Sequence, residues 1–278
     1  MTIGIVGLGL IGGSIAKAAK EKTGARILGR DISEPVVCKA RLVGAIDEPL
    51  SDENLSECGL VIVALYPGDT VAYVIEKAPL FQKGAIVVDC GGVKRPVCEA
   101  LRGVARENGF CFVGGHPMAG IEHSGFEYSK KNLFERASFI VTPYPETGIE
   151  VLETLKKFFL AIGFSRFQIS TPAEHDKLIA LTSQLAHVVS SAYVKSPNAL
   201  RYKGFSAGSF KDMTRVARLN ENMWTELFLS NADNLVGEID SFIERMTLYR
   251  QAIADADAAK LRELLKEGRE IKQSLSEV

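Results

Sequence analysis

The stretch Thr2–Gly13, TIGIVGLGLIGG, decides the fold of this chain. A short apolar run typical of a buried strand leads into the spacing G-x-G-x-x-G, and the alanine-rich run SIAKAAK at 14–20 follows as a helix. Gly7 permits a tight turn, Gly9 leaves the backbone open to a pyrophosphate, and Gly12 lets helix and strand pack closely. The helix N-terminus adds free N–H groups and a positive dipole end. The stretch therefore predicts a dinucleotide-binding strand, turn and helix.

An acidic residue follows the next predicted strand. Asp31 lies 19 residues after Gly12, where a carboxylate accepts hydrogen bonds from the adenosine ribose hydroxyls. The same charge repels a 2′-phosphate, so we expect NAD, while the neighbouring cation of Arg30 keeps NADP as the less favoured alternative. A simple turn or capping role is the other interpretation of Asp31. The predicted cofactor-binding residues are Gly7, Gly9, Leu10, Ile11, Gly12, Arg30 and Asp31.

Further short, β-branched-rich runs read as buried strands separated mostly by helical segments. These runs are residues 2–6, 25–29, 60–65, 85–89, 110–114 and 138–142, with a helix at about 147–162 and a last strand near 164–169. Strands alternating with helices predict a parallel sheet covered on both faces. The fold expected for residues 1–171 is therefore an α/β, Rossmann-type domain with a mainly parallel sheet.

The pattern changes beyond Pro172, where no convincing strand follows. Helical segments are predicted at 173–196, 211–219, 221–254 and 257–276. Residues 221–254 read as one long amphipathic helix, since apolar residues recur there at steps of three and four. We expect residues 172–278 to form an all-helical domain that binds substrate and makes a homodimer.

Composition points to small-molecule chemistry. The 33 basic and 34 acidic side chains nearly cancel and form no block, so neither nucleic acid nor a membrane surface is an expected partner. Five cysteines without a C-x-x-C pair indicate free thiols in a reducing compartment, and no metal site is expected. No apolar run approaches the roughly 20 residues of a membrane helix. A cytoplasmic enzyme fits these observations.

Four histidines can be weighed singly. His116 follows a predicted strand, at the carboxyl end of the sheet where α/β folds place ligands, so it is the candidate base; a loop histidine bonded to backbone is the alternative. His187 shares a helix face with Ser183, although a lone histidine on an apolar helix is commonly a core group. His175 is predicted to be structural, at a helix start, and His123 to lie in a solvated loop.

One cation is a candidate for carboxylate binding. Arg215 ends the segment FKDMTR at 210–215, after a glycine-containing loop. A guanidinium can hold a substrate carboxylate with two parallel hydrogen bonds. A surface residue paired with Asp212 is the alternative interpretation.

Four segments together resemble the prephenate/arogenate dehydrogenase family of tyrosine biosynthesis. They are GLGLIGGS at 7–14, GGHPMAG at 114–120, SQLAH at 183–187 and FKDMTR at 210–215. The resemblance spans nearly the whole chain and implies an NAD(P)-binding Rossmann domain followed by a helical dimerisation domain. It implies oxidative decarboxylation of prephenate to 4-hydroxyphenylpyruvate, with hydride transfer to NAD.

The resemblance also implies roles for individual residues. His116 matches the catalytic histidine, Ser183 and His187 match substrate-contacting positions, and Arg215 matches the arginine that binds substrate carboxylate. Trp224 matches an aromatic position near the substrate side chain, but as a tryptophan on an apolar helix face it also fits a core position.

The sequence departs from the family pattern at three positions. Gly92 stands where the family usually has a serine near the catalytic histidine, Ile121 replaces a common threonine, and Ala186 replaces a proline. These changes keep the base and the carboxylate-binding cation but remove polar contacts near the reacting hydroxyl. Arogenate dehydrogenase activity is the first alternative. A β-hydroxyacid dehydrogenase or imine reductase comes next, and then a dinucleotide-binding protein without catalysis.

Overall fold

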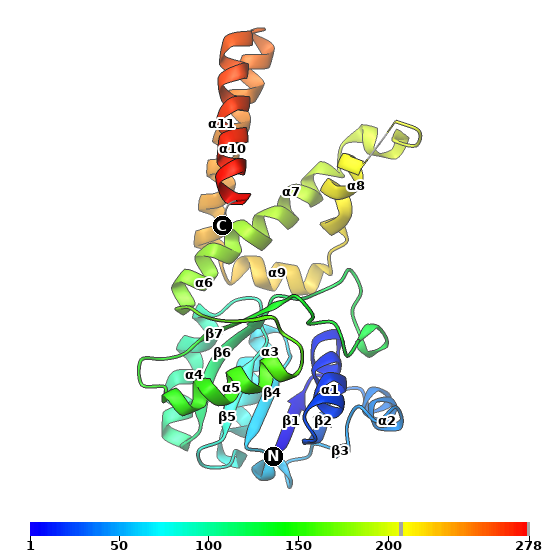
Figure 1. The fold of residues 1–278 in the computed structure, drawn as a ribbon, viewed down its shortest axis with the longest axis vertical. Coiled ribbons are helices and arrows are strands. Elements are labelled where there is room, and N and C mark those ends of the chain that lie inside the picture. Colours follow the sequence, from blue (N-terminus) through cyan, green and yellow to red (C-terminus); the bar gives the residue numbers. More distant parts are fainter. Residues whose placement is uncertain (206–207, 277–278) are drawn as a thin grey trace. The chain divides into compact units, whose positions relative to one another are not determined.

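The computed structural model describes residues 1–205 and 208–276. The chain is organised in two compact units, one formed by Met1–Asn231 and one that begins at Ala232, and each unit is described by itself (Figure 1).

An eight-stranded sheet forms the centre of the first unit, with strand order β3-β2-β1-β4-β5-β6-β7-β8. Its strands are β1 (Thr2–Val6), β2 (Arg26–Arg30), β3 (Glu48–Pro49), β4 (Leu60–Val63), β5 (Ile86–Asp89), β6 (Cys111–Pro117), β7 (Ser138–Thr142) and β8 (Arg166–Ile169). All seven predicted strands are confirmed within a few residues, and the α/β prediction with them. The sequence analysis missed β3, because a two-residue strand carries no alternating pattern.

Helices cover both faces of the sheet. The helices are α1 (Leu10–Lys22), α2 (Glu34–Leu42), α3 (Pro67–Lys77), α4 (Arg95–Asn108) and α5 (Ile149–Ala161). Side chains of α1, α2 and α5 form one core with Ile3, Ile5 and Ile62, while those of α3 and α4 form a second core with Val61 and Val63. Successive strand residues point to opposite faces, so consecutive apolar residues supply both cores.

The sheet is not parallel throughout. The first part of β6 pairs in parallel with β5, whereas Gly114–Pro117 pairs antiparallel with β7, placing His116 opposite Ile140. The prediction of a mainly parallel sheet is confirmed, and the pairing of β6 with β7 is its antiparallel exception. His116 consequently lies on a part of β6 that extends past β5, at the carboxyl end of the parallel strands.

Helices follow β8, as predicted. In the described chain they are α6 (Pro172–Ile179), a π-helical turn (Ala180–Leu185), α7 (Ala186–Tyr193), α8 (Gly208–Thr214), α9 (Glu221–Leu229), α10 (Ala232–Ala254) and α11 (Ala258–Ser276). Short 3-10 turns occur at Leu55–Glu57, Ala78–Leu80, Phe126–Tyr128, Pro197–Arg201 and Arg215–Ala217.

The single long helix predicted for 221–254 was wrong. The chain breaks at Ser230 and Asn231, between α9 and α10. Asn231 is fully buried, and its amide donates to the carbonyl of Asp176 and to the side chain of Gln184, each at 2.8 Å. A buried amide requires such partners, and they fix the chain in a turn rather than a helix at this point.

The second unit contains a helical hairpin. Helices α10 and α11 pack on each other, and the hydroxyl of Tyr249 donates to the carbonyl of Leu264 at 3.1 Å. Asp257 precedes α11, and its carboxylate accepts the N–H groups of Ala259 and Lys260, which begins the helix. Among the helices of residues 1–205 and 208–276, none is long and apolar enough to cross a membrane.

Candidate active site

The glycine turn between β1 and α1 has the geometry of a phosphate cradle. Gly7 has φ +84°, a left-handed conformation that favours glycine, and a Cβ at Gly12 would collide with the Gly7 carbonyl oxygen. A Cβ at Gly9, in contrast, would meet no heavy atom of the described chain within 4 Å. Gly9 is the N-cap of α1 and has no side chain to occupy the helix N-terminus. The open space therefore faces free backbone N–H groups.

The predicted ribose acid and its neighbouring cation have separate surroundings. One carboxylate oxygen of Asp31 accepts the N–H of Leu8 at 2.8 Å, and the other accepts the N–H of Ser33 at 2.9 Å. Asp31 thus adjoins the glycine turn and stays partly exposed. Arg30 instead donates to Asp52 at 2.9 Å. The Arg30 guanidinium is already neutralised, which favours a cofactor without a 2′-phosphate.

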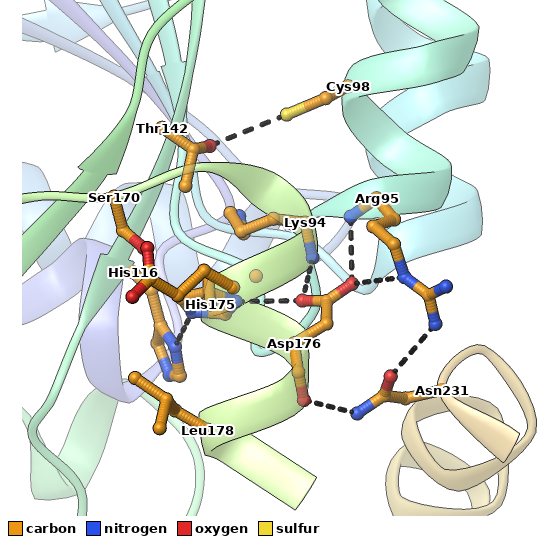
Figure 2. Close-up of polar contacts among 12 residues, drawn as sticks. Lys94, Arg95, Cys98, His116, Thr142, Ser170, His175, Asp176, Leu178 and Asn231 are labelled. Atoms are coloured by element: carbon orange, nitrogen blue, oxygen red, sulfur yellow. Dashed lines mark hydrogen bonds and ion pairs between the residues drawn. The ribbon is translucent and has the colours of Figure 1, made fainter. Parts of the chain in front are cut away.

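A chain of three hydrogen-bonded side chains begins at the base candidate (Figure 2). The Nδ1 of His116 lies 2.8 Å from the Nε2 of His175, and the Nδ1 of His175 lies 2.7 Å from a carboxylate oxygen of Asp176. His175 and Asp176 are buried, whereas His116 is partly exposed. His175 and Asp176 lie near the start of α6, which Thr171 caps through its hydroxyl and which begins at Pro172.

The hydrogen bonds determine the proton positions in this chain. The Asp176 carboxylate only accepts, so the Nδ1 of His175 carries a proton and its Nε2 accepts. The Nδ1 of His116 must then be the donor, which leaves Nε2 as its basic nitrogen. Burial holds the pKa of His116 well below its usual range, with His175 and Lys94 acting in the same direction. His116 is therefore a neutral imidazole near pH 7, ready to accept a proton.

Asp176 also joins this chain to α4. Its two carboxylate oxygens accept the backbone N–H groups of Lys94 and Arg95, each at 2.8 Å, at the N-terminus of that helix. A helix N-terminus stabilises a carboxylate through free N–H groups and its dipole. Asp176 thus holds α6 against α4 and keeps its charge next to His175.

A buried ion pair supports the strand that carries His116. Lys94 and Asp89 are both fully buried and form an ion pair through the lysine Nζ. The same Nζ donates to the carbonyl of Gly115 at 2.6 Å, while Asp89 accepts the N–H groups of Gly115 and Gly91 at 2.9 and 2.8 Å. The pair therefore fixes the residue that precedes the base candidate.

The second predicted histidine lies among aromatic groups. The Nδ1 of His187 donates to the carbonyl of Ser183 at 2.8 Å, because a carbonyl can only accept. Its ring centroid lies 3.9 Å from that of Trp224, which in turn contacts Phe228. The Nε2 of His187 is thus the acceptor in the neutral ring. Trp224 packs on the histidine in a half-buried aromatic group and is not among the fully buried core residues.

Arg215 contacts the segment that follows His116. Its guanidinium donates to Glu122 at 3.1 Å, and about two thirds of the Arg215 side chain is exposed. Burial lowers the pKa of His187, and the Arg215 charge contributes to the same shift. Arg215 is therefore near both the loop after His116 and the His187 group. The alternative pairing with Asp212 is not the ion pair found for Arg215.

The three departures from the family pattern have clear locations. Gly92 lies beneath α9, and a Cβ there would come within 3.2 Å of Leu227. Ile121 and Ala186 are exposed. The Nδ1 of His116 donates its hydrogen bond to His175 and not to residue 92.

Sequence analysis missed His175, Asp176, Lys94 and Asp89 as parts of this site. The histidine was interpreted as a helix-start residue, and 59 positions separate it from His116. No local sequence signal marked the pair, since the burial of His175 and Asp176 results from the packing of α6 against α4. The lysine gave no such signal either, because a lysine in sequence is expected to be solvated.

Comparison with family models matches most of the chain. Residues 15–166 match the nucleotide-binding domain of prephenate dehydrogenase, and residues 171–267 match the prephenate dehydrogenase dimerization domain.

Individual relatives agree with this match. The prephenate dehydrogenase of Bacillus subtilis is 32% identical over 283 residues, covering 99% of this chain and 76% of the relative. The crystal structure of prephenate dehydrogenase from Aquifex aeolicus, in complex with hydroxyphenyl propionate and NAD⁺, superposes with a TM-score of 0.85 at 30% identity and covers 99% of this chain and 98% of that one. The Synechocystis arogenate dehydrogenase structure gives a TM-score of 0.83 at 25% identity, covering 99% and 100% of the two chains.

Proposed function

This chain belongs to the prephenate dehydrogenase family, and from that premise we propose that its site performs NAD-dependent oxidative decarboxylation of prephenate to 4-hydroxyphenylpyruvate in tyrosine biosynthesis. The observation that carries the proposal is the neutral His116 at the carboxyl end of the sheet, with its Nδ1 held by His175. A base in this position can take the proton of a ring hydroxyl.

The glycine turn fits NAD. Gly9 leaves open space at the N-terminus of α1 for a pyrophosphate, and Asp31 lies beside the turn to accept ribose hydroxyls. Leu10, Ile11 and Gly12 supply the first backbone N–H groups of the helix. When bound, NAD accepts the hydride from the substrate carbon.

Replacing Gly9 by alanine is expected to weaken NAD binding about fivefold to a hundredfold without unfolding the protein. The new methyl group meets no protein atom but fills space meant for the pyrophosphate, and such overpacking costs about 1–3 kcal/mol. Calorimetric titration with NAD and thermal unfolding test this. Gly103→Ala is the matched control, since its Cβ also meets open space but lies on α4. An NAD affinity that is the same in both variants would remove Gly9 from the cofactor site.

His116 performs both proton steps in this proposal. Its Nε2 takes the proton of the ring hydroxyl as the C–H electrons leave as hydride. Loss of the ring carboxylate as carbon dioxide then returns an electron pair to the ring and aromatises it. The oxygen that gave up the proton becomes a phenolate, and His116 returns the proton to it, so the site ends in its starting protonation state.

The polar groups of the helices bind the substrate in this scheme. Arg215 pairs with a substrate carboxylate, for which it must leave Glu122. We expect Ser183 and His187 to contact the substrate and Trp224 to border its side chain, because His187 contacts both of the other residues. The glycine motif would then bind the cofactor, and these helical residues would bind the substrate.

Replacing Arg215 by alanine is expected to raise the KM for prephenate by about tenfold to a hundredfold, because a charge-assisted hydrogen bond contributes about 1.5–3 kcal/mol. Steady-state kinetics at saturating NAD provide the measurement. Arg215→Lys keeps the charge without the planar fork, so its KM should fall between those of the two proteins. Arg218→Ala, an exposed arginine three residues on, is the control. An unchanged KM in Arg215→Ala would exclude it from the substrate site.

Arogenate is the second candidate substrate, favoured by the similarity to the Synechocystis arogenate dehydrogenase. One assay separates the candidates: the purified protein with NAD or NADP is offered prephenate, arogenate or a small hydroxyacid while nicotinamide absorbance is followed. We expect fastest reduction with NAD and prephenate. Faster turnover of arogenate or of the hydroxyacid would replace the proposed substrate, and no reduction with any of them would indicate a binding protein without catalysis.

We further propose that residues 1–171 bind the cofactor and residues 172–278 bind substrate and form a homodimer in the cytoplasm. Apolar side chains remain exposed along α10, including Val236, Ile243 and Met246, and they suit burial against a second copy. The match to a dimerization domain supports this, and sedimentation velocity measures it.

A further inference from the structure

Hydrogen bonds join Asp176, His175 and His116 into a chain that leaves one ring nitrogen without a partner in the chain (Figure 2). The two imidazole rings meet edge to face, with centroids 5.0 Å apart and planes inclined by 63°, and their facing nitrogens are 2.8 Å apart. Each ring therefore uses one nitrogen along the chain. The single ring nitrogen left over is the Nε2 of His116, at the partly exposed end.

We propose that His175 and Asp176 are positioning residues for the reaction: they hold His116 in the Nδ1-protonated tautomer and compensate the positive charge that His116 acquires when it takes the substrate proton. The inference rests on the proposed function, because it assigns partners to the base of that reaction.

The charges around the rings make Asp176 the compensating group. Lys94 lowers the pKa of both histidines, but its buried ion-pair partner Asp89 opposes that effect at His175. Burial lowers the pKa of His175, and the Asp176 hydrogen bond opposes that shift. The carboxylate is in turn held by backbone N–H groups of α4 and lies beside Arg95. A positive charge on His116 can thus be shared with His175, next to a carboxylate that cannot move away.

The hydrogen bond to His175 also fixes the orientation of the His116 ring. Without the acceptor at His175 Nε2, the His116 ring could protonate on either nitrogen and rotate, so that the basic nitrogen would point away from the substrate for part of the time. The family serine that could restrain the ring is absent, since residue 92 is glycine. The histidine partner therefore provides the restraint in this chain.

Two replacements of His175 separate positioning from simple packing. The amide oxygen of His175→Gln can still accept from His116 Nδ1 but has lost the link to Asp176, whereas His175→Leu has neither. We expect kcat to fall on the order of 10²-fold in the leucine variant and by less in the glutamine variant. The KM for prephenate and the NAD dissociation constant should stay at wild-type values. Glu174→Gln, on the exposed side of the same turn, is the control and should have wild-type kcat.

A measurement on the resting protein makes the inference independent of turnover. Long-range ¹H–¹⁵N spectra of the histidine rings near pH 7 should show both His116 and His175 as neutral Nδ1–H tautomers, with signals assigned from the His116→Asn and His175→Gln proteins. An Nε2–H tautomer at His116 would overturn the inference. Wild-type kcat in both His175 variants, or an equal loss of NAD affinity and kcat, would overturn it as well.

A different result would contradict the proposed function. A wild-type protein that reduces no NAD with prephenate contradicts the function, while the ring spectra still decide whether His175 and Asp176 set the tautomer of His116.

Discussion

Converting His116 to asparagine lowers kcat by about 10²–10⁴-fold, the usual contribution of a positioned base, and leaves the NAD dissociation constant unchanged. Asparagine keeps a similar size and a polar end but cannot hold a proton. The glycine turn, which binds the cofactor in the proposed function, lies on β1 and α1 rather than on β6. Single-turnover kinetics combined with NAD titration give the two numbers. Unchanged turnover would eliminate His116 as the base.

The pH dependence provides a second measure of the same group. Because the pKa of His116 is depressed, its neutral form persists below the pH at which an ordinary histidine becomes charged. The kcat/KM of the wild-type protein should therefore hold through neutral pH and fall only when the pH drops below this lowered pKa. The residual activity of His116→Asn should lack that acidic limb. An acidic limb at the ordinary histidine pKa would contradict the burial of the base.

Replacing Lys94 by methionine is expected to lower the free energy of unfolding by about 3–5 kcal/mol, which is the usual cost of leaving one member of a buried ion pair without its partner. Asp89 would remain fully buried with its charge and two backbone N–H groups as its partners. Gly115 would lose the lysine bond to its carbonyl, so kcat should fall too. Urea unfolding and steady-state kinetics test both effects.

Two further variants serve as controls for the Lys94→Met protein. Asp89→Asn in the Lys94→Met background removes the uncompensated charge and should recover part of the lost stability. Lys156→Met changes an exposed lysine on α5 and should alter stability by no more than about 0.5 kcal/mol. A Lys94→Met protein as stable as Lys156→Met would show that the buried pair does not stabilise the fold.

The sequence predicted the parts of the molecule that depend on local pattern. The strand, turn and helix of Thr2–Gly13 were identified because glycine spacing and apolar runs have local causes, and His116 was identified because it follows the apolar run predicted as a strand at 110–114. Strand direction has no local signature, so the antiparallel step between β6 and β7 was missed. The break at Asn231 was missed for a related reason, since its buried partners come from α6 and the turn after it.

The partners of the base were the largest omission. His175 and Asp176 read as an ordinary helix start, and only the packing of α6 against α4 brings them to His116. Arg30, in contrast, was predicted to lie at the cofactor site but pairs with another residue. The sequence places it beside the ribose acid, but alternation along β2 turns it toward Asp52 instead.

The number of residues in the π-helical turn at Ala180–Leu185 sets the direction in which the His187 side chain points. An α-helix advances by about 100° per residue, and a π-turn inserts one residue more than an α-turn. Every side chain of α7, His187 included, is therefore rotated relative to a continuous helix from α6. A substitution in α7 changes one contact, whereas gain or loss of one residue in this turn re-aims the whole helix.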